Sequence, residues 1–246
     1  MLLPSAGDAA AWFVETARAA VRSGARLDAD AVQLLMSLAP DDPVVPVAID
    51  RLASDPRPAG ASEPGTGNPE RGTGNPERGT GNPEHGTRNP ERGTDVSLAE
   101  VARHATARLR DVVAAGDEAA ARETVTALET EVLRVYRPAR GLGRFEDDVA
   151  VALAMLAAYD VGDDQTHLMM AEELMLGVVR RDWTSRADRG LAANCEAAVA
   201  LAALASRTGK AEYRERAFEV MLGYAATYRE LGVDAAPYVS ALQAIS

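Results

Sequence analysis

The chain of 246 residues is rich in aliphatic residues, poor in aromatic residues and strongly acidic. Hydrophobic residues make up 47% and aromatic residues 4%, and the formal net charge is −11. A core built from Ala, Val, Leu and Met favours close-packed helices over a sheet. Binding to nucleic acid or to an anionic membrane surface requires a basic footprint, so the composition argues against both kinds of partner.

The charged residues and the cysteine count indicate the cellular environment. Lys210 is the one lysine among 26 basic residues. A GC-rich genome favours arginine codons, and acidic, lysine-poor surfaces suit a high-salt cytoplasm, so we expect a halophilic source in which both causes act. Cys195 is the one cysteine, which excludes an internal disulfide and favours a reducing, cytoplasmic location. The longest uncharged apolar run, residues 149–158, is too short to span a bilayer.

Three short helices are predicted before residue 55, at 8–23, 28–38 and 44–53. Residues 65–92 then contain four near-identical copies of GTGNPER. Each unit contains proline and glycine and lacks an aliphatic residue for a coiled-coil seam, so the period of seven does not indicate a coiled coil. We interpret 55–95 as a disordered linker between N-terminal helices at 1–54, which pack on the array, and a domain at 96–246.

Helical signals resume at Ser97, whose spacing to Glu100 fits a capping box. The expected inward-facing residues of the next two helices are Leu98, Val101, Ala105, Leu109 and Val112, then Ala121, Val125, Leu128, Val132 and Val135. The second of these helices is expected at 117–136, and five more at 146–160, 164–181, 191–207, 210–231 and 234–245.

A fainter repeat underlies these helices. Gly116, Gly162 and Gly209 lie 46 and 47 residues apart, and each of the last two separates an apolar helix from an amphipathic one. This pattern describes helical hairpins with a buried first helix and an exposed second helix. It is compatible with a closed (α/α) toroid and with an open solenoid.

The stretches at 145–181 and 190–245 resemble the C-terminal hairpins of the spermatogenesis-associated, thioredoxin-domain family. The resemblance is carried by Glu146-Asp147, by Asn194 at the start of an inner helix, and by TG-x-x-x-YRE-x-A at Thr208–Ala217. It implies an all-α fold of the six-hairpin-glycosidase-like toroid type, here partial or degenerate. The chain lacks the thioredoxin Cys-x-x-Cys, and Ala192-Ala193 replaces the family's Arg-Asp, so a separate thioredoxin-like protein is an implied partner.

The polar residues before two inner helices are the candidate site. Arg144, Glu146 and Asp147 precede or begin one helix, and Arg189 and Asn194 lie at the start of another. If they converge, they form a ligand-binding rim for a small polyol. Asp147 and Asp148 are the candidate general acid and base of an enzyme, because paired carboxylates perform that role in glycoside hydrolysis. The alternative for all of them is helix capping and surface ion pairing.

The other reactive residue types favour structural roles. Cys195 is expected in the core, the histidines at the surface or in turns, and Met169, Met170, Met175 and Met221 in gaps of the core. Gly141-Leu142-Gly143 is predicted to be a turn, and the sequence lacks metal-ligand and nucleotide-binding motifs, so no metal or cofactor is predicted. We therefore expect a non-catalytic helical domain that binds a partner protein or a small ligand; the alternative is a carbohydrate-processing enzyme.

Overall fold

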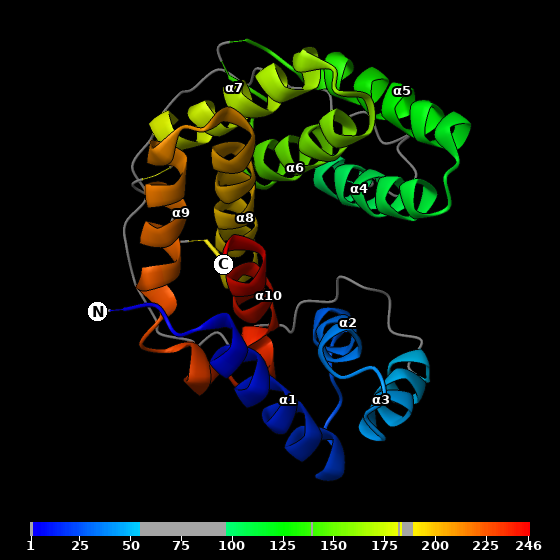
Figure 1. The fold of residues 1–246 in the computed structure, drawn as a ribbon, viewed down its shortest axis with the longest axis vertical. Helices are drawn as coiled ribbons and strands as arrows, with labels where there is room; N and C mark the ends of the chain where they lie inside the picture. Colours follow the sequence, from blue (N-terminus) through cyan, green and yellow to red (C-terminus); the bar gives the residue numbers. More distant parts are fainter. Residues whose placement is uncertain (1, 55–96, 139, 182, 184–188) are drawn as a thin grey trace, which may run out of the picture. The chain divides into compact units, whose positions relative to one another are not determined.

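The computed structural model describes residues 2–54, 97–138, 140–181, 183 and 189–246. The regular structure of these residues is helical (Figure 1). The all-α class predicted from the sequence is confirmed. The elements are α1 (Ala6–Arg22), α2 (Ala29–Leu38), α3 (Val44–Ala53), α4 (Leu98–Ala114), α5 (Glu118–Val135), α6 (Phe145–Gly162), α7 (Gln165–Arg181), α8 (Leu191–Thr208), α9 (Ala211–Tyr224), η2 (Tyr228–Ala235) and α10 (Ala236–Ile245).

Local chemistry explains where several helices begin and end. The predicted capping box at the start of α4 is present, since Ser97 Oγ accepts from Glu100 N while Glu100 accepts from Ser97 N. Asp28 and Asp117 cap α2 and α5 in the same way, each through its carboxylate. α8 ends at Gly209, whose φ of 71° is the left-handed conformation that glycine adopts without strain.

Inner and outer helices differ as the sequence pattern predicts. α6 and α8 are apolar around most of their circumference and are buried along most of their length. α7 and α9 bury one face only and expose charged residues on the other. α6 and α8 therefore lie in the interior, because neither helix has a broad polar face that needs contact with solvent.

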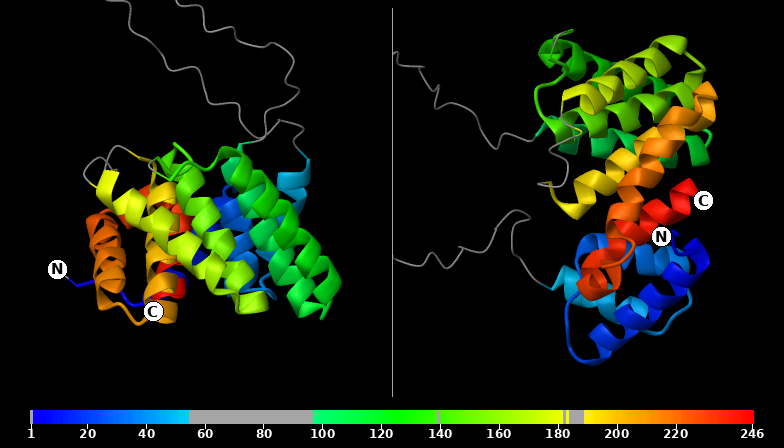
Figure 2. Two further views of the ribbon diagram at one scale, coloured as in Figure 1. Left: turned by 90° about the horizontal axis from the view of Figure 1, so that it is seen from above. Right: turned by 90° about the vertical axis from the view of Figure 1, so that its left-hand side faces the viewer.

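The helices on both sides of residues 55–95 belong to one compact unit. Within it, α4 contacts α6, α6 contacts α8, α8 contacts α10, and α10 contacts α2. Each of these five helices carries a partner: α5 on α4, α7 on α6, α9 on α8, α1 on α10 and α3 on α2. The views of Figures 1 and 2 show α1 and α10 side by side, so helices from opposite ends of the chain pair with each other.

The scarce aromatic residues concentrate where α1, η2 and α10 meet. The Trp12 ring lies edge-on to Tyr228 at 5.1 Å between centroids, and Tyr228 stacks on Tyr238 at 4.8 Å. Offset and edge-to-face aromatic pairs stabilise packing beyond the area that they bury. These contacts join the N-terminal helices to the hairpins.

The sequence prediction of one helix at 210–231 was wrong. α9 ends at Tyr224, and the chain continues through the 3₁₀ segment η2, where Gly232 adopts φ 60° and ψ −128°. That conformation is not helical and favours glycine. The turn redirects the chain into α10.

Three side chains also lie elsewhere than predicted. His167 was expected at the surface or in a turn, but it is buried and its Nε2 lies 2.8 Å from Glu129 Oε1. Met169 is 68% exposed rather than in the core, and Val135 is exposed rather than inward-facing. Hydrophobic periodicity located the helices, but it did not predict on which side of its helix each of these three side chains lies.

The GTGNPER repeat, His85 and the predicted linker at 55–95 lie outside the described residues. Among the helices that the structure does describe, none is both long and apolar enough to cross a membrane.

Candidate functional site

Asp147, a residue of the predicted rim, is used to hold another helix. Its carboxylate Oδ1 accepts a hydrogen bond of 2.8 Å from the backbone N–H of Ala99, in the first turn of α4. The side chain is buried. A buried anion at a helix N-terminus satisfies a backbone donor and complements the helix dipole, so Asp147 couples α6 to α4.

Asp148 holds together three segments. Its Oδ1 accepts from Leu142 N at 2.8 Å, and its Oδ2 lies 2.7 Å from Arg181 Nη2 at the end of α7. Gly141, at φ 62°, passes so close that a Cβ atom there would lie 2.6 Å from Asp148 Oδ1. The predicted turn at 141–143 is therefore confirmed, and glycine is required in it because the carboxylate occupies the space of a side chain.

The remaining residues of the predicted rim divide into two small groups. Arg189 lies 3.8 Å from Glu146 and stacks its guanidinium 4.3 Å above the Phe145 ring. Asn194 Nδ2 donates to the carbonyl oxygens of Arg189 and Gly190 and, at 2.8 Å, to Tyr224 Oη.

Arg144 is exposed at the position before α6. The structure thus brings Glu146, Arg189 and Asn194 near one another, whereas Asp147 and Asp148 point toward α4 and Arg181. A ligand-binding role for this region stays a prediction.

A different set of residues surrounds a cavity of about 590 Å³. Five helices, α2, α4, α6, α8 and α10, contribute to its walls, and all five belong to the series of contacting helices described above. We call it the central cavity. Its lining residues are Asp30, Gln33, Leu34, Ser37, Arg110, Leu153, Ala192, Cys195, Glu196, Val199, Pro237, Ser240, Ala241, Gln243 and Ala244. The rim residues predicted from the sequence are absent from this lining.

Two carboxylates from helices far apart in the sequence line the central cavity. Glu196 is held by Arg103 of α4 through a two-point contact, with Nε–Oε1 at 2.6 Å and Nη2–Oε2 at 2.8 Å. Although Asp30 is well exposed, partial loss of hydration raises its pKa, and the charges of Asp28 and Glu196 raise it further. Arg103 acts in the opposite direction on the pKa of Asp30. Neighbouring carboxylates with unequal environments are suited to different protonation behaviour.

Cys195 also lines the cavity, but it is a poor nucleophile. The residue is 2% exposed, and burial, together with the charge of Glu196, raises the pKa of the thiol to about 12. The thiolate is the reactive form, so Cys195 contributes an apolar surface rather than chemistry at neutral pH. This agrees with the core position predicted from the sequence.

The rest of the lining alternates polar and aliphatic groups. Gln33, Ser37, Ser240 and Gln243 supply hydroxyl and amide groups, and Leu34, Leu153, Val199 and Ala241 supply apolar surface. Hydroxyls and amides both donate and accept hydrogen bonds, whereas carboxylates only accept. The combination suits a small molecule with several hydroxyl groups and apolar C–H surface.

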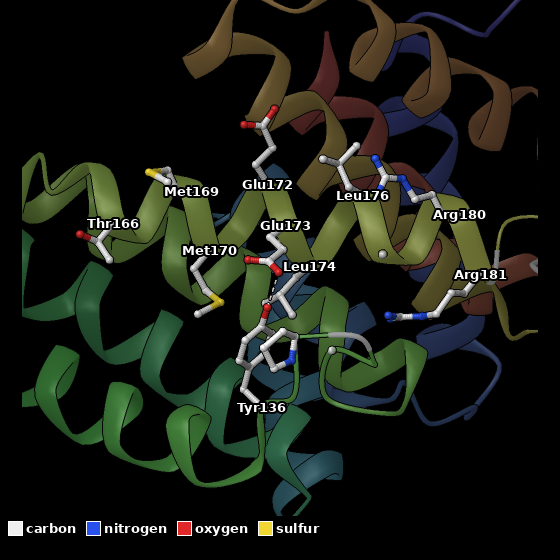
Figure 3. Close-up of a pocket in the computed structure, with 13 residues that line it drawn as sticks. Tyr136, Thr166, Met169, Met170, Glu172, Glu173, Leu174, Leu176, Arg180 and Arg181 are labelled. Carbon is white, nitrogen blue, oxygen red and sulfur yellow. Dashed lines mark hydrogen bonds between the residues drawn. The ribbon is translucent and has the colours of Figure 1, made fainter.

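A second concavity of about 650 Å³ lies along the outer side of α7 and the segment from Tyr136 to Gly141 (Figure 3). It has one helix and one turn as its walls, in contrast to the five helices around the central cavity. Ligand sites that enclose a small molecule require walls on several sides. The central cavity is therefore the better candidate for a small-molecule site.

Within the described ranges, no group of three or more His, Cys, Asp or Glu residues is placed to hold a metal ion. Comparisons with protein-family models, with curated proteins and with solved structures find no match for the chain. The interpretation of the site therefore depends on its own residues.

Sequence reasoning missed Asp30, Arg103, Arg110 and Glu196. One signal was present, since Glu196 is the sole charged residue between Leu191 and Ser206 of an apolar helix. A charge retained in such a run faces either a partner or a cavity. No sequence signal predicted that Asp30 and Glu196 line one cavity. Their proximity depends on α10, which packs against both α2 and α8.

Proposed function

We propose that the protein is a non-catalytic helical domain that binds a small polyhydroxylated ligand in the central cavity. The observation that carries this proposal is the lining itself, in which five helices place carboxylate, amide and hydroxyl groups around one space with aliphatic residues between them.

We infer that the helices form an open (α/α) toroid of five helix pairs, four of them hairpins of consecutive helices and the fifth the pair of α1 with α10. The inner series of α4, α6, α8, α10 and α2, each with an outer partner, supports this arrangement. The pairing of α1 with α10 supports it further, because a ring brings the two ends of a chain together. The arrangement agrees with the family resemblance of residues 145–181 and 190–245.

Glu196 would be the principal hydrogen-bond acceptor for the ligand. Its contact with Arg103 fixes the carboxylate in one orientation, which reduces the entropy lost when a ligand binds. A carboxylate with two oxygens can accept from adjacent hydroxyl groups of a polyol. Gln33 and Gln243 can donate to ring or hydroxyl oxygens, and Leu153 and Val199 can contact C–H groups.

A screen of neutral sugars and polyols by ligand-observed NMR tests the proposal. We expect at least one class of compound to receive saturation from the protein and to lose it in Glu196→Gln. Loss of a hydrogen bond to a charged group is expected to weaken binding at least about tenfold. The matched control is Glu118→Gln on α5, whose side chain is 84% exposed and does not line the cavity. Binding by none of the compounds, or binding unaffected by Glu196→Gln, would contradict the proposal.

A carbohydrate-processing enzyme is the second candidate, and a specific observation favours it. The pKa of Asp30 is raised by partial desolvation and nearby negative charge, while Arg103 holds the Glu196 carboxylate through a two-point contact. A raised pKa suits a general acid, and an anchored carboxylate suits a general base. In this version Asp30 and Glu196 replace Asp147 and Asp148 as the catalytic pair.

Turnover measurements separate the two candidates. If the protein is an enzyme, a substrate identified in the binding screen is converted, and Asp30→Asn abolishes conversion while leaving binding detectable. Turnover that survives both Asp30→Asn and Glu196→Gln would exclude this pair.

A further inference from the structure

The outer face of α7 carries a stripe of four residues at helical spacing: Met169, Glu173, Leu176 and Arg180. Offsets of four, seven and eleven residues place their side chains on one side of a helix. The buried residues of α7, which include Ala171, Met175 and Val178, lie on the opposite side. Met169, Glu173 and Arg180 are exposed, whereas Leu176 is half-buried against the core, and all four lie along the concavity or its edge (Figure 3).

This face exposes large apolar side chains. Met169 is 68% exposed. On α5, Leu133 is 67% exposed and lies on the same side of its helix as Glu129, which contacts His167 of α7. Exposed apolar residues that cluster, rather than occur singly, mark interaction surfaces. Methionine adapts its shape to an apposed surface.

The charges on the stripe are ordered around its apolar centre. Glu173 and Arg180 lie on either side of Leu176, seven residues and therefore about 10 Å apart along the helix. Their midpoint falls between Leu176 and Gly177. Reversing the direction of the helix about this midpoint exchanges the position of the acid with that of the base.

Other contacts on α7 show which of its charges are available for this purpose. Glu172 is engaged with Lys210 and Tyr213, and Arg181 with Asp148. Glu173 accepts a hydrogen bond from Tyr136 Oη at 2.5 Å, which orients its carboxylate within the concavity. Arg180 is exposed at the other end of the stripe.

We propose that the α7 stripe is the contact of a symmetric homodimer, in which two α7 helices pair antiparallel across a two-fold axis near Leu176. In a two-fold interface the same patch serves both protomers, so residue i of one meets residue j of its partner twice. Glu173 of each protomer then meets Arg180 of the other, and the two Leu176 side chains lie beside each other near the axis. The partner is a second copy of this chain, because the acid and the base of one stripe face the base and the acid of an antiparallel copy.

Charge reversal tests this pairing through sedimentation velocity across about 1–200 µM protein, a range that captures micromolar dissociation constants. We expect the wild-type chain to form dimers. Glu173→Arg places like charges opposite each other at both ends, as does Arg180→Glu, and either change is expected to weaken the dimer at least about tenfold. Mixing the two single variants is expected to restore association as a heterodimer, and the double variant E173R/R180E is expected to restore the homodimer.

The matched control reverses another exposed pair on an outer helix, Arg216 and Glu219 of α9, which form an i, i+3 ion pair. Its reversal should leave the dimer unchanged. A chain that is monomeric throughout the range, or a dimer that neither reversal of the stripe weakens, contradicts the proposal. Failure of the mixture and of the double variant to recover association also contradicts it.

Disulfide trapping provides a measurement that does not depend on charge variants folding correctly. The one native thiol, Cys195, is buried, so Leu176→Cys introduces a single partly exposed thiol near the two-fold axis. Oxidation is expected to give a covalent dimer, whereas Ala107→Cys on the exposed side of α4 should not. Equal cross-linking at both positions would count against the proposed axis.

Discussion

The start of α6 and the central cavity contain similar polar residues, but they use them differently. At the start of α6, Asp147 accepts from Ala99 N, and Asp148 accepts from Leu142 N and pairs with Arg181. In the central cavity, Asp30 and Glu196 line a volume of about 590 Å³ with amide and hydroxyl groups beside them. The first set connects segments of the fold, and the second set faces space that a ligand can occupy.

The difference teaches that the partners of a carboxylate, rather than its burial, indicate its role. Asp148 is 1% exposed, which alone would suggest a tuned catalytic acid, but both of its oxygens hold neighbouring segments. Glu196 is only partly buried, yet Arg103 orients it beside a cavity. Substitutions in the first region should therefore affect stability, and those in the second should affect binding.

The largest effect on stability is expected from Asp148→Ala. The change removes one partner of Arg181 and the acceptor of the Leu142 N–H. Removing one member of a buried pair costs about 3–5 kcal/mol, and partial exposure of Arg181 places the expected loss near the lower end. Urea denaturation measures it. The control is Asp160→Ala, whose exposed pair with Arg207 should contribute less than about 1 kcal/mol.

A loss of similar size is expected from Gly141→Ala, with Gly143→Ala as its matched control. Both glycines have positive φ, which costs an alanine about 1–2 kcal/mol. At Gly141 the new Cβ would also meet Asp148 Oδ1, and such overpacking adds about 1–3 kcal/mol. No atom lies within 4 Å of the Cβ built at Gly143. Equal losses in thermal unfolding at the two positions would show that Asp148 does not restrict the turn.

Asp147→Ala is expected to lower the free energy of unfolding by about 1–2 kcal/mol, because it removes the charged acceptor for Ala99 N at the start of α4. Hydrogen exchange at the first turn of α4 should increase in parallel. Unchanged protection of Ala99 would contradict the role assigned to this carboxylate.

The smallest effect on stability is expected from Glu196→Gln. The contact with Arg103 is partly exposed, and such pairs contribute about 0–1 kcal/mol. The midpoint of urea unfolding should therefore stay close to that of the wild type. A loss as large as that of Asp148→Ala would place Glu196 among the structural carboxylates and remove the distinction between the two regions.

Sequence patterns predicted most of the fold because helix boundaries depend on local chemistry. The capping box of Ser97 and Glu100, the glycine at 209 and the all-apolar character of α6 and α8 were readable in the chain. The break after Tyr224 was missed because the residues that form η2 lack a proline to mark it. His167 was misplaced because its burial depends on Glu129 of a neighbouring helix.

The candidate site was harder to predict because it depends on distant contacts. The sequence prediction chose the rim residues because they lie at the starts of inner helices. Polar residues at helix starts can equally well hold loops and helix ends in place. Asp30 and Glu196 are separated by most of the chain and line one cavity through the packing of α2, α10 and α8. No local pattern encodes that contact.

The most direct test of the central claim compares Glu196→Gln with Glu146→Gln in ligand-observed NMR against the sugars and polyols that bind the wild-type protein. The two substitutions remove the same charge, one in the central cavity and one beside Arg189 at the start of α6. Our account predicts that Glu196→Gln weakens binding at least about tenfold and that Glu146→Gln leaves it unchanged. Loss of binding in Glu146→Gln with retention in Glu196→Gln would contradict the account and return the site to the start of α6.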